Sequence, residues 1–174
     1  TLQLAKAISN GILSGGSSVD IFSVSDTSAP TSYSDVAKYH GFIIGSPVFF
    51  GNPSSQSLQW IFSNLGPGWE NRTFANLPAA VFATGGGIHQ GTEGTLESLT
   101  RALLNFGFRP VTPDVETNGY SSSLGASAVT GTPPYFIGTN PVAKQFLDAG
   151  SSLGAKLAKE VQKEWFFRCS VVNI

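Results

Sequence analysis

The chain of 174 residues contains little charge and almost no cysteine. Charged residues make up 12% of it and the formal net charge is -1, so it lacks the basic surface that binds nucleic acid or anionic membranes. Cys169 is its one cysteine, which excludes an internal disulfide and a cysteine-ligated zinc site. No apolar run is long enough to span a bilayer, and the N-terminus lacks the basic-then-apolar order of a signal peptide. We therefore expect a cytoplasmic protein that is not transmembrane and does not bind nucleic acid.

The length and the hydrophobic content predict one domain, residues 1–174. A hydrophobic fraction of 41% is typical of a globular chain, and 174 residues can enclose a sizeable core. The charged fraction is about half that of an ordinary soluble domain, which suggests that other subunits cover part of the surface. The composition therefore predicts a homo-oligomer.

Strand-like and helix-like segments alternate along the chain. Two short apolar runs without polar alternation, 41–45 and 79–83, are typical of strands buried on both faces of a parallel sheet. This order predicts an α/β fold with right-handed crossovers. The expected helices are 2–12, 53–65, 92–106 and 142–163, the expected strands are 19–24, 41–45, 79–83 and 109–112, and 118–139 is expected to be a long loop.

Glycine-rich loops follow both buried strands directly. In open α/β sheets ligands bind beyond the carboxyl ends of the strands, so these loops are the first candidates for a site. The first loop, Ser46–Asn52, combines a proline, two phenylalanines and a glycine, which suits a planar apolar ring. The second, Thr84–Glu93, begins with three consecutive glycines after Thr84, whose backbone N–H groups are free to bond a heteroaromatic cofactor.

Neither loop matches a common nucleotide motif. The second loop has Gln90 where a dinucleotide fingerprint needs its third glycine, and no Gly-Lys-Ser/Thr follows to make a phosphate-binding P-loop. Glu93 falls in the first turn of the next helix, where the helix dipole favours a carboxylate. It is either a ligand-binding residue or simply a favourable residue at a helix start.

The two loops together resemble a known family. Pro-x-x-Phe-Gly-Asn after one strand and Thr-Gly-Gly-Gly-x-x-Gln-Gly-x-Glu after the next are similar to the flavodoxin-like NAD(P)H:quinone oxidoreductases, the tryptophan-repressor-binding-protein family. The resemblance extends from Thr1 to about Lys159 and includes Trp69 and Leu153-Gly154. It implies a flavodoxin-like three-layer sandwich with a parallel sheet, FMN as the cofactor, and NAD(P)H and a quinone as substrates.

The resemblance also implies the site residues. Val48, Phe49 and Phe50, with the backbone of 84–88, would hold the isoalloxazine ring, and Trp69 would flank the place where quinone or nicotinamide stacks. The alternative for Trp69 is an aromatic of the core or of an interface. The implied cofactor-binding residues are Thr1, Pro47, Val48, Phe49, Phe50, Gly51, Asn52, Thr84, Gly85, Gly86, Gly87, Ile88 and Asn105, and the implied substrate-binding residues are Trp69 and His89.

The chain departs from the family at three of these positions. Val48-Phe49 stands where the family has Thr-Arg, so a cationic contact to the flavin region is lost. Asn105 stands where the family has a histidine, and it can hydrogen-bond but cannot titrate near neutral pH. His89 lies in an insertion in the second loop, where it either restores an imidazole to the site or is an exposed histidine without a role.

The sequence begins at the helix that follows the family's first strand and phosphate loop, with Thr1 as the last residue of that loop. The sheet is therefore expected to lack its first strand or to replace it. We hypothesise that the apolar, β-branched segment Phe166–Val172 folds back into this position. The other interpretation is that the sequence is truncated.

Three functions remain open at this stage. The first is an FMN-dependent NAD(P)H:quinone oxidoreductase, in which the flavin carries the chemistry and no side-chain base is needed. The second is a flavodoxin-type electron carrier, although such carriers are strongly acidic and this chain is not. The third is a non-catalytic assembly subunit that keeps the fold without binding FMN.

Overall fold

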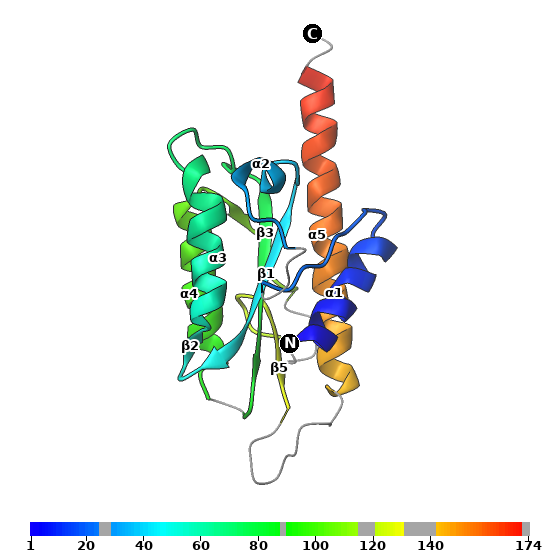
Figure 1. The fold of residues 1–174 in the computed structure, drawn as a ribbon. Helices are drawn as coiled ribbons and strands as arrows, with labels where there is room; N and C mark the ends of the chain where they lie inside the picture. The colour runs from blue at the N-terminus through cyan, green and yellow to red at the C-terminus, as the bar shows by residue number, and fades with distance from the viewer. Residues whose placement is uncertain (25–28, 88–89, 115–120, 131–141, 172–174) are drawn as a thin grey trace.

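The computed structural model describes residues 1–24, 29–87, 90–114, 121–130 and 142–171 (Figure 1). The helices are α1 (Leu2–Ser14), α2 (Tyr33–Val36), α3 (Ser55–Leu65), the 3₁₀ turn η1 (Gly66–Gly68), α4 (Thr92–Asn105) and α5 (Lys144–Val171). The strands are β1 (Phe42–Phe49), β2 (Asn52–Pro53), β3 (Pro78–Gly85), β4 (Arg109–Pro110) and β5 (Ala126–Val129).

The sheet is built around β3. β1 runs parallel to β3, from Phe42 opposite Ala79 to Pro47 opposite Thr84. The short strands β4 and β5 run parallel to β3 as well, β4 beside its start and β5 beside its end. All eight residues of β3 are buried. The two predicted strands are thus confirmed and both extend beyond the predicted ranges, but only β3 is buried at every position, whereas burial alternates along β1.

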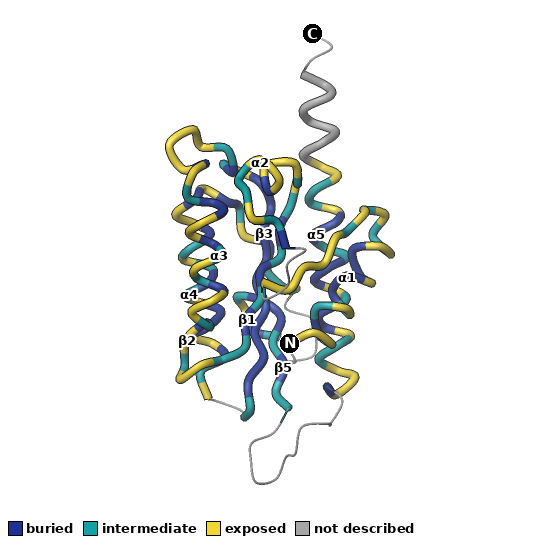
Figure 2. Tube along the Cα trace, viewed as in Figure 1, coloured by how far each residue is buried: buried dark blue, intermediate teal, exposed yellow. Residues whose placement is uncertain are grey.

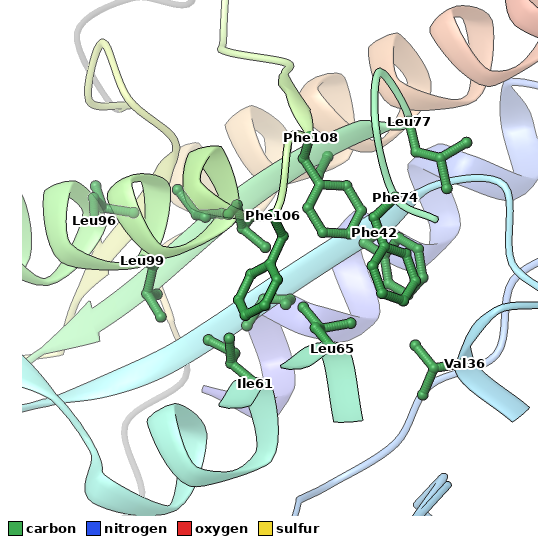
Figure 3. Close-up of a cluster of buried hydrophobic side chains, with 14 of the residues drawn as sticks. Val36, Phe42, Ile61, Leu65, Phe74, Leu77, Leu96, Leu99, Phe106 and Phe108 are labelled. Carbon is green, nitrogen blue, oxygen red and sulfur yellow. The ribbon is translucent and has the colours of Figure 1, made fainter. Parts of the chain in front are cut away.

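Two apolar layers cover the two faces of the sheet (Figures 1 and 2). On the α3 and α4 side, Phe42, Phe74 and Phe108 meet, with the rings of Phe74 and Phe108 stacked at a centroid distance of 5.3 Å (Figure 3). On the other side, α1 and α5 pack over a second cluster that includes Phe82 and Leu153. The predicted three-layer α/β sandwich is confirmed.

Glycines let α1 and α5 pack against each other at very short range. A Cβ atom on Gly11 would overlap the carbonyl oxygen of Ser151, and one on Gly154 would overlap the carbonyl oxygen of Ile8. Because these neighbours are backbone atoms, they cannot rotate away. The two helices therefore form one layer whose spacing these glycines set.

Two sequence-based expectations are wrong. Residues 19–24 form no strand, and Ile21, Phe22 and Val24 are 40 to 46% exposed, because no strand among the described residues lies beside them to pair with. The proposed strand Phe166–Val172 is also wrong: residues 166–171 continue α5, since extending a helix that is already packed costs little (Figure 1). Val172 lies outside the described residues.

The C-terminal segment therefore does not replace a strand of the sheet. β1 pairs with β3 along one edge, and with β2 only through Val48 and Phe49 on the other. Within the described residues, no strand lies beside the outer edge of β1 from Phe42 to Pro47.

One strand was missed. β5 lies inside the expected loop 118–139, of which 121–130 is described. Its residues are small because space there is short: a Cβ on the preceding Gly125 would overlap the carbonyl oxygen of Val81. Small residues carry a weak strand signal in a sequence.

Among the described helices, none is long and apolar enough to cross a membrane.

Candidate functional site

The first glycine loop is a tight hairpin turn at the carboxyl end of β1. Phe49 pairs with Asn52, and the two residues between them, Phe50 and Gly51, have φ of +46° and +79°. Positive φ at both central positions matches the twist of an antiparallel hairpin. Asn52 Nδ2 donates a hydrogen bond to the Phe50 carbonyl oxygen at 3.0 Å. The turn presents Phe50 to solvent, where it is 99% exposed.

The base of this loop is fixed by Ser46. Its side chain is fully buried, and its Oγ donates to the Pro47 carbonyl oxygen at 2.7 Å and accepts from the Ser54 N–H at 2.8 Å. Ser54 in turn caps α3, since its side chain accepts a hydrogen bond from the Ser57 N–H. The loop is therefore anchored at both ends, to β1 and to α3.

The second glycine loop leaves β3 at the same edge of the sheet. The pairing of Pro47 with Thr84 brings the ends of β1 and β3 to one level. The Gly85 carbonyl oxygen accepts hydrogen bonds from Thr130 N–H at 3.1 Å and Thr130 Oγ1 at 3.3 Å. Thr130, directly after β5, therefore lies on one side of the start of this loop. On the other side, Val48 Cγ2 lies 3.5 Å from the position that a Cβ would take on Gly85.

The two loops touch through their backbones. Gly91, which precedes α4, has φ of +94°, and a Cβ on it would overlap the Cα of Gly51. A Cβ on Gly94 would lie 3.1 Å from the Gly51 carbonyl oxygen. A side chain at Gly91 would push the loops apart, so glycine fixes their spacing.

The residues at this edge fit a planar heteroaromatic ring. In the part of the chain that the structure describes, the N–H groups of Gly86 and Gly87 have no hydrogen-bond partner. They are donors for ring carbonyl oxygens and nitrogens, and Val48 and Phe49 supply apolar surface beside them.

Thr1 lies at the same edge. Its Oγ1 is 2.7 Å from the Oγ1 of Thr84, and no side chain caps the first turn of α1. The N–H groups and the dipole at a helix start favour an anion, which fits a phosphate group. The described residues thus offer both a ring surface and a helix start at one end of the sheet.

Trp69 and Asn105 lie together at the opposite end. Trp69 is 60% exposed, and its Nε1 donates to the Asn105 carbonyl oxygen at 3.1 Å. Asn105 ends α4, four residues before Arg109, which pairs with Pro78 at the start of β3. Since a strand of this length spans about 23 Å, the structure brings these two residues to each other but not to the loops of the same chain.

Three further residues of the second loop, Ile88, His89 and Glu93, were also candidates for the site. Ile88 and His89 lie outside the described residues. Glu93, in the first turn of α4, accepts a hydrogen bond from Ser122 Oγ at 2.6 Å, and this favours a structural role for its carboxylate. The sequence analysis missed Thr130, although it follows a short apolar run and precedes a glycine, as Thr84 does.

A family model and curated relatives match the chain. The model described as NADPH-dependent FMN reductase matches residues 1–118. A Caulobacter vibrioides protein named NAD(P)H dehydrogenase (quinone) is 30% identical over 148 residues, which cover 76% of this chain and 72% of that protein. A Candida albicans protein named NAD(P)H quinone oxidoreductase YCP4 is 29% identical over 154 residues, which cover 79% of this chain. The chain spans about half the length of the Candida protein, 53%.

Solved structures share the fold. A WrbA-like flavodoxin from Agrobacterium tumefaciens superposes with a TM-score of 0.65 at 14% identity, covering 93% of this chain and 89% of that one. An archaeal flavodoxin gives a TM-score of 0.66 at 16% identity, covering 93% and 90%. These comparisons confirm the flavodoxin-like fold and the resemblance on which the site residues were predicted.

Proposed function

Because the chain belongs to the NADPH-dependent FMN reductase family, we propose that it is an FMN-dependent NAD(P)H:quinone oxidoreductase. Family membership and the names of the relatives indicate an oxidoreductase. In the proposed reaction NAD(P)H gives up a hydride, and the quinone gains these two electrons with one proton from NAD(P)H and one from solvent. The products are NAD(P)⁺ and a hydroquinone.

The contact between the two glycine loops carries this proposal. When bound, FMN would supply the hydride and electron transfer chemistry. The N–H groups of Gly86 and Gly87 would bond the polar edge of its ring, and Val48 and Phe49 would cover an apolar part of it. The start of α1, with Thr1 beside Thr84, would face the phosphate.

Visible absorbance with and without added FMN tests the cofactor directly. We expect the purified chain to bind FMN at micromolar concentration and to oxidise NADPH in the presence of benzoquinone. Failure to bind FMN would reject the enzyme and the electron carrier together, and would leave the assembly subunit. FMN binding without turnover of NADPH would favour the carrier.

We further propose that the protein is a homo-oligomer in which one copy completes the site of another. Trp69 and Asn105 lie at the wrong end of their own sheet to flank a bound ring, but Trp69 is exposed and available to a neighbour. The low charged fraction of 12% supports a covered surface. In this arrangement Trp69 would flank the place where quinone or nicotinamide stacks.

Light scattering measures the oligomeric state, and mixed oligomers test the shared site. Gly91→Val alters the loops and Trp69→Ala alters the opposite end. Each variant alone should lose activity, and co-expression of the two should restore part of it, because some sites then combine two intact halves. A monomer, or an absence of restored activity, would contradict the shared site.

A cytoplasmic location stays a prediction.

A further inference from the structure

Two consecutive phenylalanines at the carboxyl end of β1 are exposed beside the glycine loops. Phe49 is 58% exposed and Phe50 is 99% exposed. Exposed aromatic rings lose the favourable free energy that burial would give them. Neither ring belongs to the two core clusters, and both lie next to the loops of the candidate site.

The alternation of β1 places Phe49 on the α1 side of the sheet. Phe42 and Ile44 belong to the core on the α3 and α4 side, whereas Ile43 packs against the core on the α1 and α5 side. Side chains at every second position share a face, so Phe49 shares the face of Ile43.

The second glycine loop meets α1 on this same side of the sheet. On β3, Phe82 belongs to the core on that side and Thr84 contacts Thr1 of α1. Because Pro47 pairs with Thr84, Phe49 lies level with Gly86, two residues further along. Phe49 and the N–H groups of Gly86 and Gly87, which have no partner among the described residues, therefore lie at the same end of the sheet.

The backbone at Phe50 is held in an unfavourable region. Its φ of +46° is one that bulky residues rarely adopt, and glycine or asparagine would fit it with less strain. Such strain collects where a side chain is needed in one position. The hairpin imposes this positive φ, and a ring that is 99% exposed makes almost no contact within the chain that would offset the strain.

The charge around this space favours a neutral ligand. Segments 46–54 and 84–93 contain no lysine and no arginine. Glu93 is the one carboxylate in them, and His89 the one residue that can become cationic. Apart from the start of α1, which would face the phosphate, an anionic acceptor would gain little here, because these two segments offer it no lysine or arginine.

We infer that this site selects neutral quinones that carry an apolar substituent, with Phe49 as the residue that sets the specificity. The inference rests on the proposed function. The substituent would lie against the part of the Phe49 and Phe50 rings that a bound flavin leaves exposed, and would remove it from water.

The ratio of two kcat/KM values tests this inference. One substrate is a decyl-substituted benzoquinone and the other a sulfonated naphthoquinone, both with the same NAD(P)H donor, so that effects on the donor cancel. The wild type should prefer the neutral quinone by at least about tenfold. Phe49→Arg should lower that ratio at least about tenfold, mainly through KM, and Phe49→Leu should keep most of it.

Phe62→Arg is the matched control. Phe62 is 57% exposed on α3, so the substitution adds the same charge at the same exposure away from the loops, and the ratio should not change. Equal kcat/KM for both quinones in the wild type, or an unchanged ratio in Phe49→Arg, would overturn the inference while leaving the reductase intact. An absence of any quinone reduction would reject the proposed function itself.

Discussion

Glycine has opposite uses in the α1–α5 helix pair and in the two loops at the carboxyl end of the sheet. Between the helices, Gly11 and Gly154 make room for a neighbouring backbone, so their missing side chains add packing. In the loops, Gly51 has open space around it and positive φ, and Gly86 and Gly87 leave N–H groups without partners among the described residues. We therefore expect the first set to serve stability and the second set to serve a ligand, and substitutions should separate the two.

The largest effect is expected at Gly11. In Gly11→Ala the added methyl meets the Ser151 backbone, so the helices must move apart and the free energy of unfolding should fall by about 3 kcal/mol. Thermal or urea unfolding measures this change. FMN affinity of the folded protein should stay near that of the wild type, and a selective loss of FMN affinity with unchanged stability would contradict a purely structural role for Gly11.

Gly91→Ala should show the reverse pattern. The methyl group would push against Gly51 at a positive φ and separate the loops, so FMN affinity should fall at least about tenfold by titration while stability falls by about 1 to 2 kcal/mol. Gly66→Ala is the control, because Gly66 has open space and φ of -51°. Equal FMN affinity in both variants would mean that the loop contact does not shape the site.

Phe50→Asn should stabilise the free protein. Asparagine tolerates the left-handed region better than phenylalanine, and a ring that is 99% exposed contributes little to folding, so we expect a gain of about 0.5 to 1 kcal/mol. Urea unfolding checks the gain, and turnover of the decyl quinone should fall in the same variant. A loss of stability would show that the ring packs against the chain after all.

The smallest effect is expected at Glu160 of α5. Its carboxylate contacts Lys163 and Arg109, and the hydrogen bond from Lys163 is the main reason why its pKa lies below the usual value. A lowered pKa stabilises the fold above the pKa of the unfolded chain, and this contribution disappears as the pH falls through the folded-state pKa.

Glu160→Gln should therefore cost about 0.5 kcal/mol at pH 7 and nothing at strongly acidic pH, as measured by unfolding at both. Glu97→Gln, in an exposed pair with Arg101 on α4, is the control and should cost no more. A cost for Glu160→Gln that persists in acid would point to packing rather than to charge.

The strongest sequence signals gave the most accurate predictions. The runs 41–45 and 79–83 predicted β1 and β3 because an apolar run without polar alternation indicates a buried strand, although only β3 is buried at every position and burial alternates along β1. The two glycine loops follow from their position after these strands. Most helix ends were off by one or two residues, as at Ser54, where the side-chain cap rather than Pro53 sets the start of α3, but α5 runs on to Val171, well beyond the predicted end at residue 163.

The wrong predictions share one cause, since strands depend on neighbours that lie far away in sequence. Residues 19–24 have a strand's composition but no strand beside them among the described residues, whereas β5 has weak composition and a fully buried neighbour in β3. The separation of Trp69 and Asn105 from the loops could not be predicted either, because motif order says nothing about which end of the sheet each residue reaches.

The outer edge of β1 has a consequence for hydrogen exchange. In a parallel sheet successive amides of a strand point to opposite sides, so from Phe42 to Ser46 they should alternate between slow exchange, where they bond β3, and fast exchange, where they face the open edge. A strand docked on that edge would slow the fast set alone. The exchange rates of the β1 amides would therefore show, residue by residue, whether the sheet ends at β1 or continues beyond it.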